Sequence, residues 1–276
     1  MSKITIQKIQ EMKDNNEKIT MVTSYDYATA CVVDKAGIEM ILVGDSLMMT
    51  VMGESSTVPC EMDDMIHHIK AVRSGTKDAL LVGDMPFGSY NVSKEQAIMN
   101  VNRMMKEGGC DVVKLEGGRE VADTVKAIVD SGTPVMGHVG LTPQTVSKMG
   151  GFKVQGKGEA AEAVLQDALA LQEAGVFSIV LEGIPEALGK LITAKLRVPT
   201  IGIGGGRFTD GQVMVFHDML GFFDKFVPKF VKQYMQLNKE IVTALETYKA
   251  EVKAGIFPAE EHTFGGVSDE ELKRLY

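Results

Sequence analysis

The sequence has no tryptophan and only three cysteines, Cys31, Cys60 and Cys110, which form no CxxC pair. An odd number of cysteines without that spacing argues against a disulfide framework and against structural zinc, and it indicates the reducing cytoplasm. The sequence also lacks any stretch of about 18 uncharged apolar residues, and its N-terminus lacks the apolar core of a signal peptide. We therefore expect no membrane association.

Positive charge is in deficit, because 29 Lys and Arg stand against 37 Asp and Glu, for a net charge of −8. Such a surface repels phosphate backbones and anionic lipids, so nucleic acid is not an expected partner. A linker rich in Pro, Gly or Ser is also missing. Although 276 residues allow two domains of about 150 residues each, α/β barrels of about 250 residues form one. We expect a single domain over residues 1–276.

Short apolar segments alternate with amphipathic segments along almost the whole chain, a pattern typical of βα units around a parallel sheet. The expected strands are residues 19–24, 40–44, 79–83, 112–115, 135–138, 178–181, 200–203 and 212–215. Helical periodicity between and after them includes residues 62–74, 94–107, 120–130, 159–173, 185–195 and, as a closing helix, 229–250. Eight strands with seven crossovers predict an α/β fold, a (β/α)8 TIM barrel, with an open doubly wound sheet as the alternative. A short leading N-terminal helix at 6–13 and a C-terminal tail at 256–276 lie outside the repeat.

The second to the sixth expected strands all end in a polar residue. These residues are Asp45, Asp84, Glu116, His138 and Glu182. One such residue is usually a helix cap or a turn residue, but five in succession converge at one mouth of a parallel barrel. Lys114 faces the same way as Glu116, because side chains alternate along a strand. The sequence therefore predicts an active site at the C-terminal ends of the strands.

Asp45, Asp84 and Glu116 are hard oxygen ligands that suit Mg²⁺ better than zinc. A metal bound there would polarise a 2-oxo acid and stabilise its enolate, which leaves Glu182 free to act as the base. Lys114 and His138 would then bind the substrate carboxylate or the developing oxyanion. The alternative is Schiff-base chemistry at Lys114, against which the nearby carboxylates act by keeping the lysine protonated.

Three other features have both a structural and a functional interpretation. The glycine-rich run at residues 200–212 either binds phosphate or makes tight turns. His67 and His68 lie in a helical pattern, where a structural role is the better expectation. His217, followed by Asp218, is also expected to be structural.

Several motifs, in order along nearly the whole chain, resemble the ketopantoate hydroxymethyltransferase family. They are VGDS at 43–46, GDMPFGSY at 83–90, VKLEGG at 113–118, GHVGLTPQ at 137–144, GGFKVQGK at 150–157, VLEGIP at 180–185, DGQVMVFHDMLG at 210–221 and FPAEEHTF near the C-terminus. The resemblance implies a (β/α)8 barrel that transfers a hydroxymethyl group from 5,10-methylenetetrahydrofolate to 3-methyl-2-oxobutanoate. The product would be 2-dehydropantoate, for pantothenate and coenzyme A synthesis, and the enzyme would be a homo-oligomer.

The resemblance also implies roles for individual residues. It implies Mg²⁺ ligands at Asp45, Asp84 and Glu116, 2-oxo acid contacts at Asp45, Ser46, Asp84 and Lys114, a general base at Glu182, and His138 beside the substrate. The implied reaction begins with chelation of the oxo acid, continues with removal of its C3 proton, and ends with attack of the metal-stabilised enolate on the one-carbon unit. Met48 stands where the family usually has Gly, and residues 49–60 are atypical, which bears on folate access.

Two alternative functions remain at this stage. One is a Mg²⁺-dependent C–C or P–C bond lyase or mutase of the phosphoenolpyruvate type, which turnover without folate would favour. The other is a barrel that binds a metabolite without turnover, which Mg²⁺-dependent deuterium exchange at C3 of the oxo acid would exclude.

Overall fold

Eight parallel strands form a closed barrel in a computed structural model that describes residues 3–223 and 226–276. The strands are β1 (Ile19–Thr23), β2 (Met40–Val43), β3 (Leu80–Asp84), β4 (Val112–Lys114), β5 (Val135–Gly140), β6 (Ser178–Glu182), β7 (Thr200–Ile203) and β8 (Gly211–Met214). They follow one another in sequence order, and β1 pairs with β8 to close the barrel. The predicted TIM barrel is therefore confirmed, because an open doubly wound sheet would leave two edge strands unpaired.

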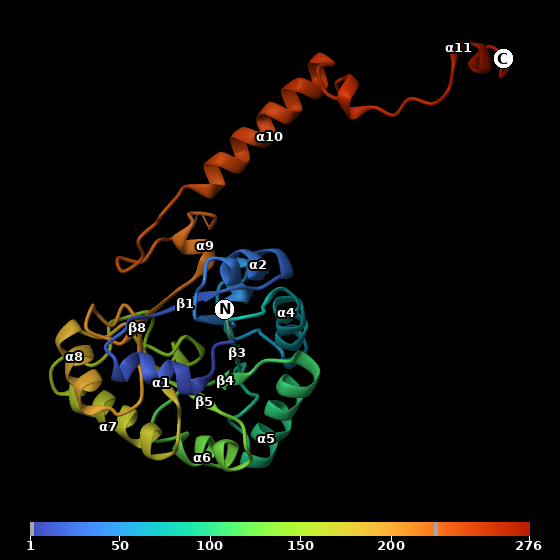
Figure 1. Ribbon diagram of the computed structural model, residues 1–276. Helices are drawn as coiled ribbons and strands as arrows, with labels where there is room; N and C mark the ends of the chain where they lie inside the picture. The colour runs from blue at the N-terminus through green and yellow to red at the C-terminus, as the bar shows by residue number, and fades with distance from the viewer. Residues whose placement is uncertain (1–2, 224–225) are drawn as a thin grey trace.

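Helices surround most of the barrel as an outer ring (Figure 1). They are α2 (Tyr27–Lys35), α4 (Met62–Gly75), α5 (Lys94–Arg103) with the π-helix η1 (Met104–Gly108), α6 (Ala122–Asp130), α7 (Ala160–Glu173) and α8 (Glu186–Lys195). The short helix α3 (Leu47–Thr50) and the 3₁₀ turn η2 (Pro143–Thr145) lie in the loops after β2 and β5. Their apolar residues recur every three or four positions and form one buried face, as Ile69 and Val72 do in α4. This face packs against the outward side chains of the strands, such as Leu81 and Val113.

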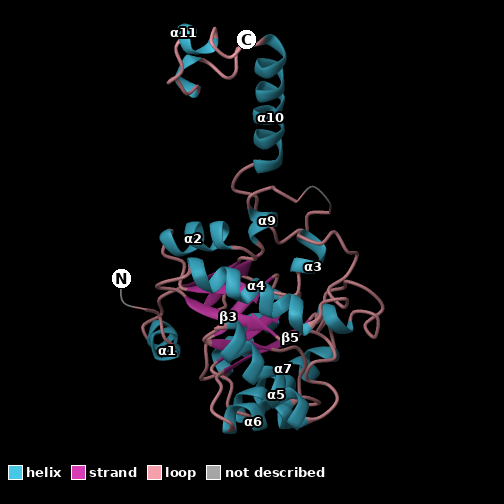
Figure 2. Ribbon diagram, turned by 90° about the vertical axis from the view of Figure 1, so that its right-hand side faces the viewer, coloured by secondary structure: helices cyan, strands magenta, loops and turns pink. Residues whose placement is uncertain are grey.

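The chain departs from the expected repeat after β7. Residues 204–210, all described, join β7 to β8 without a helix, and Gly204 and Gly206 turn the backbone there with positive φ angles of 63° and 87°. The closing helix predicted at 229–250 is α10 (Leu237–Ala254), which comes after the short α9 (Phe216–Met219). None of the 18 residues of α10 is buried, and the helix stands away from the barrel in two perpendicular views (Figures 1 and 2). The prediction that this helix completes the ring within its own chain was therefore wrong.

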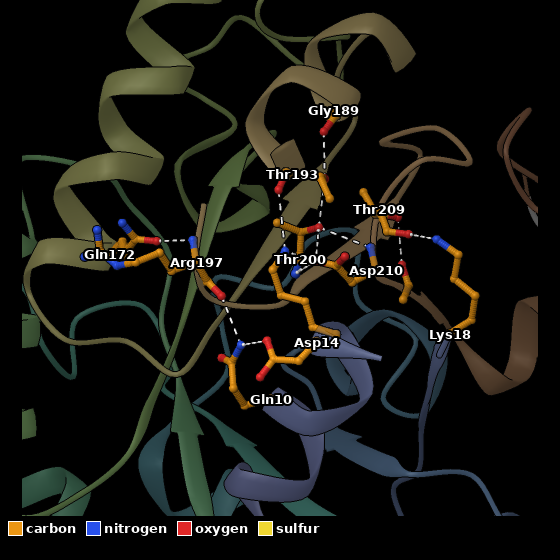
Figure 3. Close-up of polar contacts among 12 residues, drawn as sticks. Gln10, Asp14, Lys18, Gln172, Gly189, Thr193, Arg197, Thr200, Thr209 and Asp210 are labelled. Carbon is orange, nitrogen blue, oxygen red and sulfur yellow. Dashed lines mark hydrogen bonds and ion pairs between the residues drawn. The ribbon is translucent and has the colours of Figure 1, made fainter. Parts of the chain in front are cut away.

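The leading helix α1 (Ile6–Asp14) covers the N-terminal end of the barrel, and Figure 2 shows it on the opposite side of the strands from α3. Its residues Ile9 and Met12 are buried against the apolar barrel interior. Polar contacts tie it to the last strands: Lys13 Nζ lies 2.7 Å from Asp210 Oδ2. Figure 3 shows Asp210 bonded to Thr200, and Gln10 bonded to the carbonyl of Arg197. The charged strand ends lie at the other end of the barrel.

The barrel interior is apolar towards the N-terminal ends of the strands and charged at their C-terminal ends. Inward side chains fill the apolar part in packed layers, as in other TIM barrels; they include Met21, Met40, Leu80 and Val112. The tail beyond α10 holds η3 (Glu260–His262) and α11 (Asp269–Leu272). Among the described residues, no helix is both long and apolar enough to cross a membrane.

Candidate active site

The charged residues predicted at the strand ends meet in one buried cluster. Asp84 and Lys114 are the last residues of β3 and β4, paired in register, and Lys114 Nζ lies 2.6 Å from Asp84 Oδ1. The backbone N–H of Asp45, two residues beyond β2, donates to Asp84 Oδ2 at 3.2 Å. Glu116 lies two residues beyond β4 and is equally buried. One ammonium therefore faces three carboxylates.

Burial and mutual repulsion perturb the acids of this cluster. Burial raises the pKa of Asp45 to about 7, and the neighbouring Asp84 adds to the rise, while Lys114 and Gln144 oppose it. Burial also raises the pKa of Glu116 well above its usual value, against the opposing effect of Lys114. Burial alone would lower the pKa of Lys114, but Asp84, Glu116 and Asp45 together raise it. Lys114 is held as a cation, which argues against its use as a Schiff-base nucleophile.

His138 and Glu182 form the other side of the site. Glu182 ends β6 and pairs with Gly140 of β5, two residues after His138. His138 Nε2 lies 3.2 Å from Glu182 Oε2, and His138 Nδ1 lies 3.7 Å from Glu116 Oε1. Neither ring nitrogen has a hydrogen bond with good geometry among the described residues. The Glu182 side chain is 15% exposed, against 2% for Glu116, so Glu182 is the more accessible of the two carboxylates.

Ser46 lies next to Asp45 and directly precedes α3. Its hydroxyl is 2.8 Å from that of Tyr25, which follows β1 and is fully buried. Burial raises the pKa of Tyr25 to about 12, so its hydroxyl keeps its proton and can donate to Ser46. Ser46 therefore lies beside the cluster, and the 2-oxo acid contact that the family resemblance implies for it stays a prediction.

Two further residues of the site were not singled out from the sequence. Gln144, in η2 after β5, donates from Nε2 to Asp45 Oδ2 at 2.9 Å and from its backbone N–H to Glu116 Oε2 at 3.0 Å. Tyr90, in the loop after β3, places its hydroxyl 2.6 Å from Gln144 Oε1. Both are polar and come shortly after a strand, as the other site residues do. A search for polar residues over the whole loop after each strand, and not only at its first positions, would have included Tyr90 and Gln144.

Two of the other histidines, His68 and His217, make contacts consistent with the structural roles predicted for them. His68 Nδ1 lies 2.6 Å from the carbonyl oxygen of Tyr25, with α4 thereby tied to the end of β1. His217 packs between Tyr25 and Phe222, with ring centroids at 5.4 and 5.3 Å. Burial lowers the pKa of His217, which favours the neutral ring.

The glycine-rich run and Met48 are also explained by packing. A side chain on Gly205 would come within 2.7 Å of the Leu181 carbonyl, and one on Gly204 within 2.8 Å of Phe230. These close approaches support the tight-turn interpretation of the run. Met48 is buried in the hydrophobic layer between barrel and helices, where it fills the core.

Within residues 3–223 and 226–276, no three His, Cys, Asp or Glu side chains form a ready-made metal centre, so the Mg²⁺ triad stays a prediction. The donor chemistry fits a hard divalent cation, since Asp45, Asp84 and Glu116 offer carboxylate oxygens and, when all three are ionised, exceed Lys114 by two negative charges. Burial raises the pKa of the nearby Cys60 thiol, and Asp45 and Asp84 raise it further. Cys60 therefore offers no thiolate to a softer metal.

A closed parallel barrel with buried acids at its C-terminal mouth defines the class: this is a TIM-barrel enzyme. Among solved structures, the chain is similar to phosphonopyruvate hydrolase in complex with oxalate and Mg²⁺, with a TM-score of 0.61 and 12% identity over 100% of this chain and 95% of that one. It is also similar to 2,3-dimethylmalate lyase, a PEP mutase/isocitrate lyase superfamily member, with a TM-score of 0.59 and 11% identity over 98% and 94%. At such low identity these likenesses show the shared fold alone.

The sequence itself identifies the family. Residues 3–260 match the pattern that describes ketopantoate hydroxymethyltransferase. A 3-methyl-2-oxobutanoate hydroxymethyltransferase of Heliobacterium modesticaldum is 57% identical over 99% of both chains, and one of Syntrophomonas wolfei is 54% identical over 100% of both. The chain belongs to the ketopantoate hydroxymethyltransferase family, and it is a transferase. The resemblance seen in the motifs is thereby confirmed.

Proposed function

We propose that this enzyme transfers a hydroxymethyl group from 5,10-methylenetetrahydrofolate to 3-methyl-2-oxobutanoate and so makes 2-dehydropantoate for pantothenate synthesis. The names of its relatives support the oxo acid as substrate. The observation that carries the proposal is the buried cluster of three carboxylates around Lys114, with Glu182 separate from it on β6. The cluster suits a chelated 2-oxo acid, and the separate glutamate suits a base.

Asp45, Asp84 and Glu116 would hold Mg²⁺, whose two positive charges match the excess negative charge of the cluster. When bound, the metal supplies electrophilic stabilisation of the charge that develops on the oxo oxygen of the substrate. Lys114 stays protonated, because the three carboxylates raise its pKa. It would therefore attract the substrate carboxylate and orient the oxo acid.

Glu182 would remove the C3 proton of the oxo acid. Its carboxylate is more exposed than that of Glu116 and lies 3.2 Å from His138 Nε2, which places His138 beside the proposed base and free to bind an oxyanion. Loss of the C3 proton leaves the electron pair delocalised into the neighbouring carbonyl as an enolate. Water would hydrolyse the methylene bridge of the folate to a one-carbon carbonyl, which releases tetrahydrofolate. The C3 carbon would then attack this carbonyl carbon, and the carbonyl oxygen would take up a proton to become the hydroxyl of the hydroxymethyl group.

Product formation from 3-methyl-2-oxobutanoate, measured with and without 5,10-methylenetetrahydrofolate, tests this function. We expect 2-dehydropantoate only when both substrates and Mg²⁺ are present. Cleavage or rearrangement of a 2-oxo acid without folate would contradict the proposal and favour the lyase or mutase chemistry of the phosphoenolpyruvate type.

We also propose that the enzyme is a homo-oligomer in the cytoplasm. The α10 residues Leu245, Tyr248 and Val252 are 61%, 55% and 44% exposed, and with Ile241 they fall at spacings of three and four residues on one face. An apolar stripe of this kind normally packs against another surface. A second copy of the chain offers one at the hollow beside β1 and β8 that Thr20, Gln212 and Phe230 line. The three free cysteines fit a reducing compartment.

A further inference from the structure

Gln144 contacts the carboxylate cluster through both its side chain and its backbone. The residue is buried in η2, at the mouth of the barrel. Its side-chain Nε2 contacts Asp45 Oδ2 and the Met85 carbonyl, both at 2.9 Å, and its backbone N–H donates to Glu116 Oε2 at 3.0 Å. One residue thus binds two of the three carboxylates proposed to hold Mg²⁺, on two different strand ends.

The orientation of the Gln144 amide is fixed by its surroundings. Asp45 Oδ2 and the Met85 carbonyl are acceptors, so both amide hydrogens point to them, and the amide oxygen faces Tyr90. A flipped amide would place its oxygen against two acceptors. The Tyr90 hydroxyl also lies 3.0 Å from the carbonyl oxygen of Glu116, so its single proton faces two acceptors, this carbonyl and the amide oxygen of Gln144.

We propose that Gln144, oriented by Tyr90, is a positioning residue that sets the Asp45 and Glu116 carboxylates for a shared divalent cation. This inference rests on the Mg²⁺ site of the proposed function. Gln144 binds Asp45 Oδ2 and Glu116 Oε2 and leaves Asp45 Oδ1 and Glu116 Oε1 outside its hydrogen bonds. Each carboxylate is thus held through one oxygen, and its second oxygen, which is not bonded to Gln144, is the one proposed to bind the cation; His138 Nδ1 lies 3.7 Å from Glu116 Oε1.

The neutrality of Gln144 matters as much as its hydrogen bonds. A lysine or arginine at this place would also bind the two carboxylates, but it would cancel the negative charge that attracts a divalent cation. The amide donates hydrogen bonds without adding charge, so it leaves the net charge of the carboxylate cluster unchanged. Partners of this kind, which contact metal ligands but not the metal, typically contribute about 10- to 100-fold to metal affinity.

Calorimetric titration with Mg²⁺ on the full-length protein tests the inference. The Gln144→Met variant keeps the length and burial of the side chain but loses its side-chain hydrogen bonds to Asp45 and Met85, while the backbone N–H that binds Glu116 remains. We expect a dissociation constant about 10- to 100-fold higher than wild type. Tyr90→Phe should raise the dissociation constant for Mg²⁺ by a smaller factor. In a Gln144→Met background it should have no further effect, because Tyr90 acts through the Gln144 amide. Gln172→Met is the matched control, since Gln172 is a buried glutamine of α7 that accepts from the Arg197 N–H, on an outer helix.

The outcomes separate the inference from the function on which it rests. Weaker Mg²⁺ binding in Gln144→Met with unchanged binding in Gln172→Met supports it. Wild-type affinity in Gln144→Met overturns it and leaves the Mg²⁺ site intact, and an equal loss in Gln172→Met overturns it by showing general destabilisation. A wild-type protein that binds no Mg²⁺ overturns the metal site itself. If circular dichroism shows that Gln144→Met is unfolded, the Mg²⁺ affinity of Tyr90→Phe tests the inference instead, and an affinity equal to that of wild type overturns it.

Discussion

At the level of single residues, the ionisation of the site depends on one ammonium group, that of Lys114, which faces the carboxyl groups of Asp45, Asp84 and Glu116. Lys114 Nζ lies 2.6 Å from Asp84 Oδ1. Burial raises the pKa values of Asp45 and Glu116, and the opposing effect of the Lys114 charge is too small to cancel this rise at either residue. The sequence predicted which charged side chains converge, since the alternation along strands and the common mouth of a barrel are regular. The hydrogen bonds of Gln144 were beyond prediction, because the path of the loop after β5 sets its position.

Asp84→Asn keeps the size of the side chain but removes the charge that binds both Lys114 and a hard cation. We expect Mg²⁺ affinity and turnover to fall together, by about tenfold or more in affinity, with the circular dichroism spectrum unchanged. Asp210→Asn is the control, because Asp210 pairs with Lys13 at the opposite end of the barrel. Unchanged Mg²⁺ dependence in Asp84→Asn would rule out its role as a ligand.

Lys114→Met preserves most of the stem and deletes the cation. If Lys114 binds the substrate anion, the KM for 3-methyl-2-oxobutanoate should rise about 10- to 100-fold, as the loss of a charge-assisted hydrogen bond costs about 1.5–3 kcal/mol. Steady-state kinetics at saturating Mg²⁺ measures this effect. A lower kcat with unchanged KM would show that Lys114 does not bind the anion.

At the scale of elements, the apolar periodicity predicted all eight strands to within two residues of their bounds. It failed after β7, because residues 204–210 turn back on glycines and because α10 has an apolar stripe like that of a packed helix. Local sequence shows that a face is apolar, but not which surface covers it. The strand ends also depend on backbone details, as the pairing of Gly140 with Glu182 illustrates.

Gly140 ends β5 with φ at +97°, and a side chain there would come within 2.3 Å of the Glu182 carbonyl oxygen. Gly140→Ala should therefore lower the free energy of unfolding by more than about 1 kcal/mol and reduce kcat by displacing Glu182. Gly132→Ala is a matched control, because Gly132 has φ at +102° with nothing within 4 Å of the added carbon. Denaturant unfolding and kcat should show a smaller loss there, and equal effects would refute displacement of Glu182.

At the scale of the whole molecule, the barrel and α10 have opposite properties. The barrel buries its apolar residues in two layers, whereas α10 leaves Leu245 and Tyr248 in solvent. A second chain that covers this stripe would remove the exposed apolar surface from water.

Size-exclusion chromatography with light scattering should therefore give a mass well above the 29.9 kDa of one chain. The double variant Leu245→Lys with Tyr248→Lys should shift the protein to a smaller species, because it places charge in the apolar contact. Glu246→Lys, on the same helix but outside the stripe, should leave the mass unchanged. A wild-type monomer would contradict the proposed oligomer.

Deuterium exchange at C3 of 3-methyl-2-oxobutanoate, followed by NMR without folate, isolates the proton removal proposed for Glu182 from the later transfer step. Wild-type protein should exchange this proton only with Mg²⁺ present. Glu182→Gln is nearly isosteric but accepts no proton, so it should still bind Mg²⁺ and the oxo acid while exchange and hydroxymethyl transfer both fall about 10²- to 10⁴-fold. Exchange by Glu182→Gln at the wild-type rate, or exchange by wild type without Mg²⁺, would contradict the account.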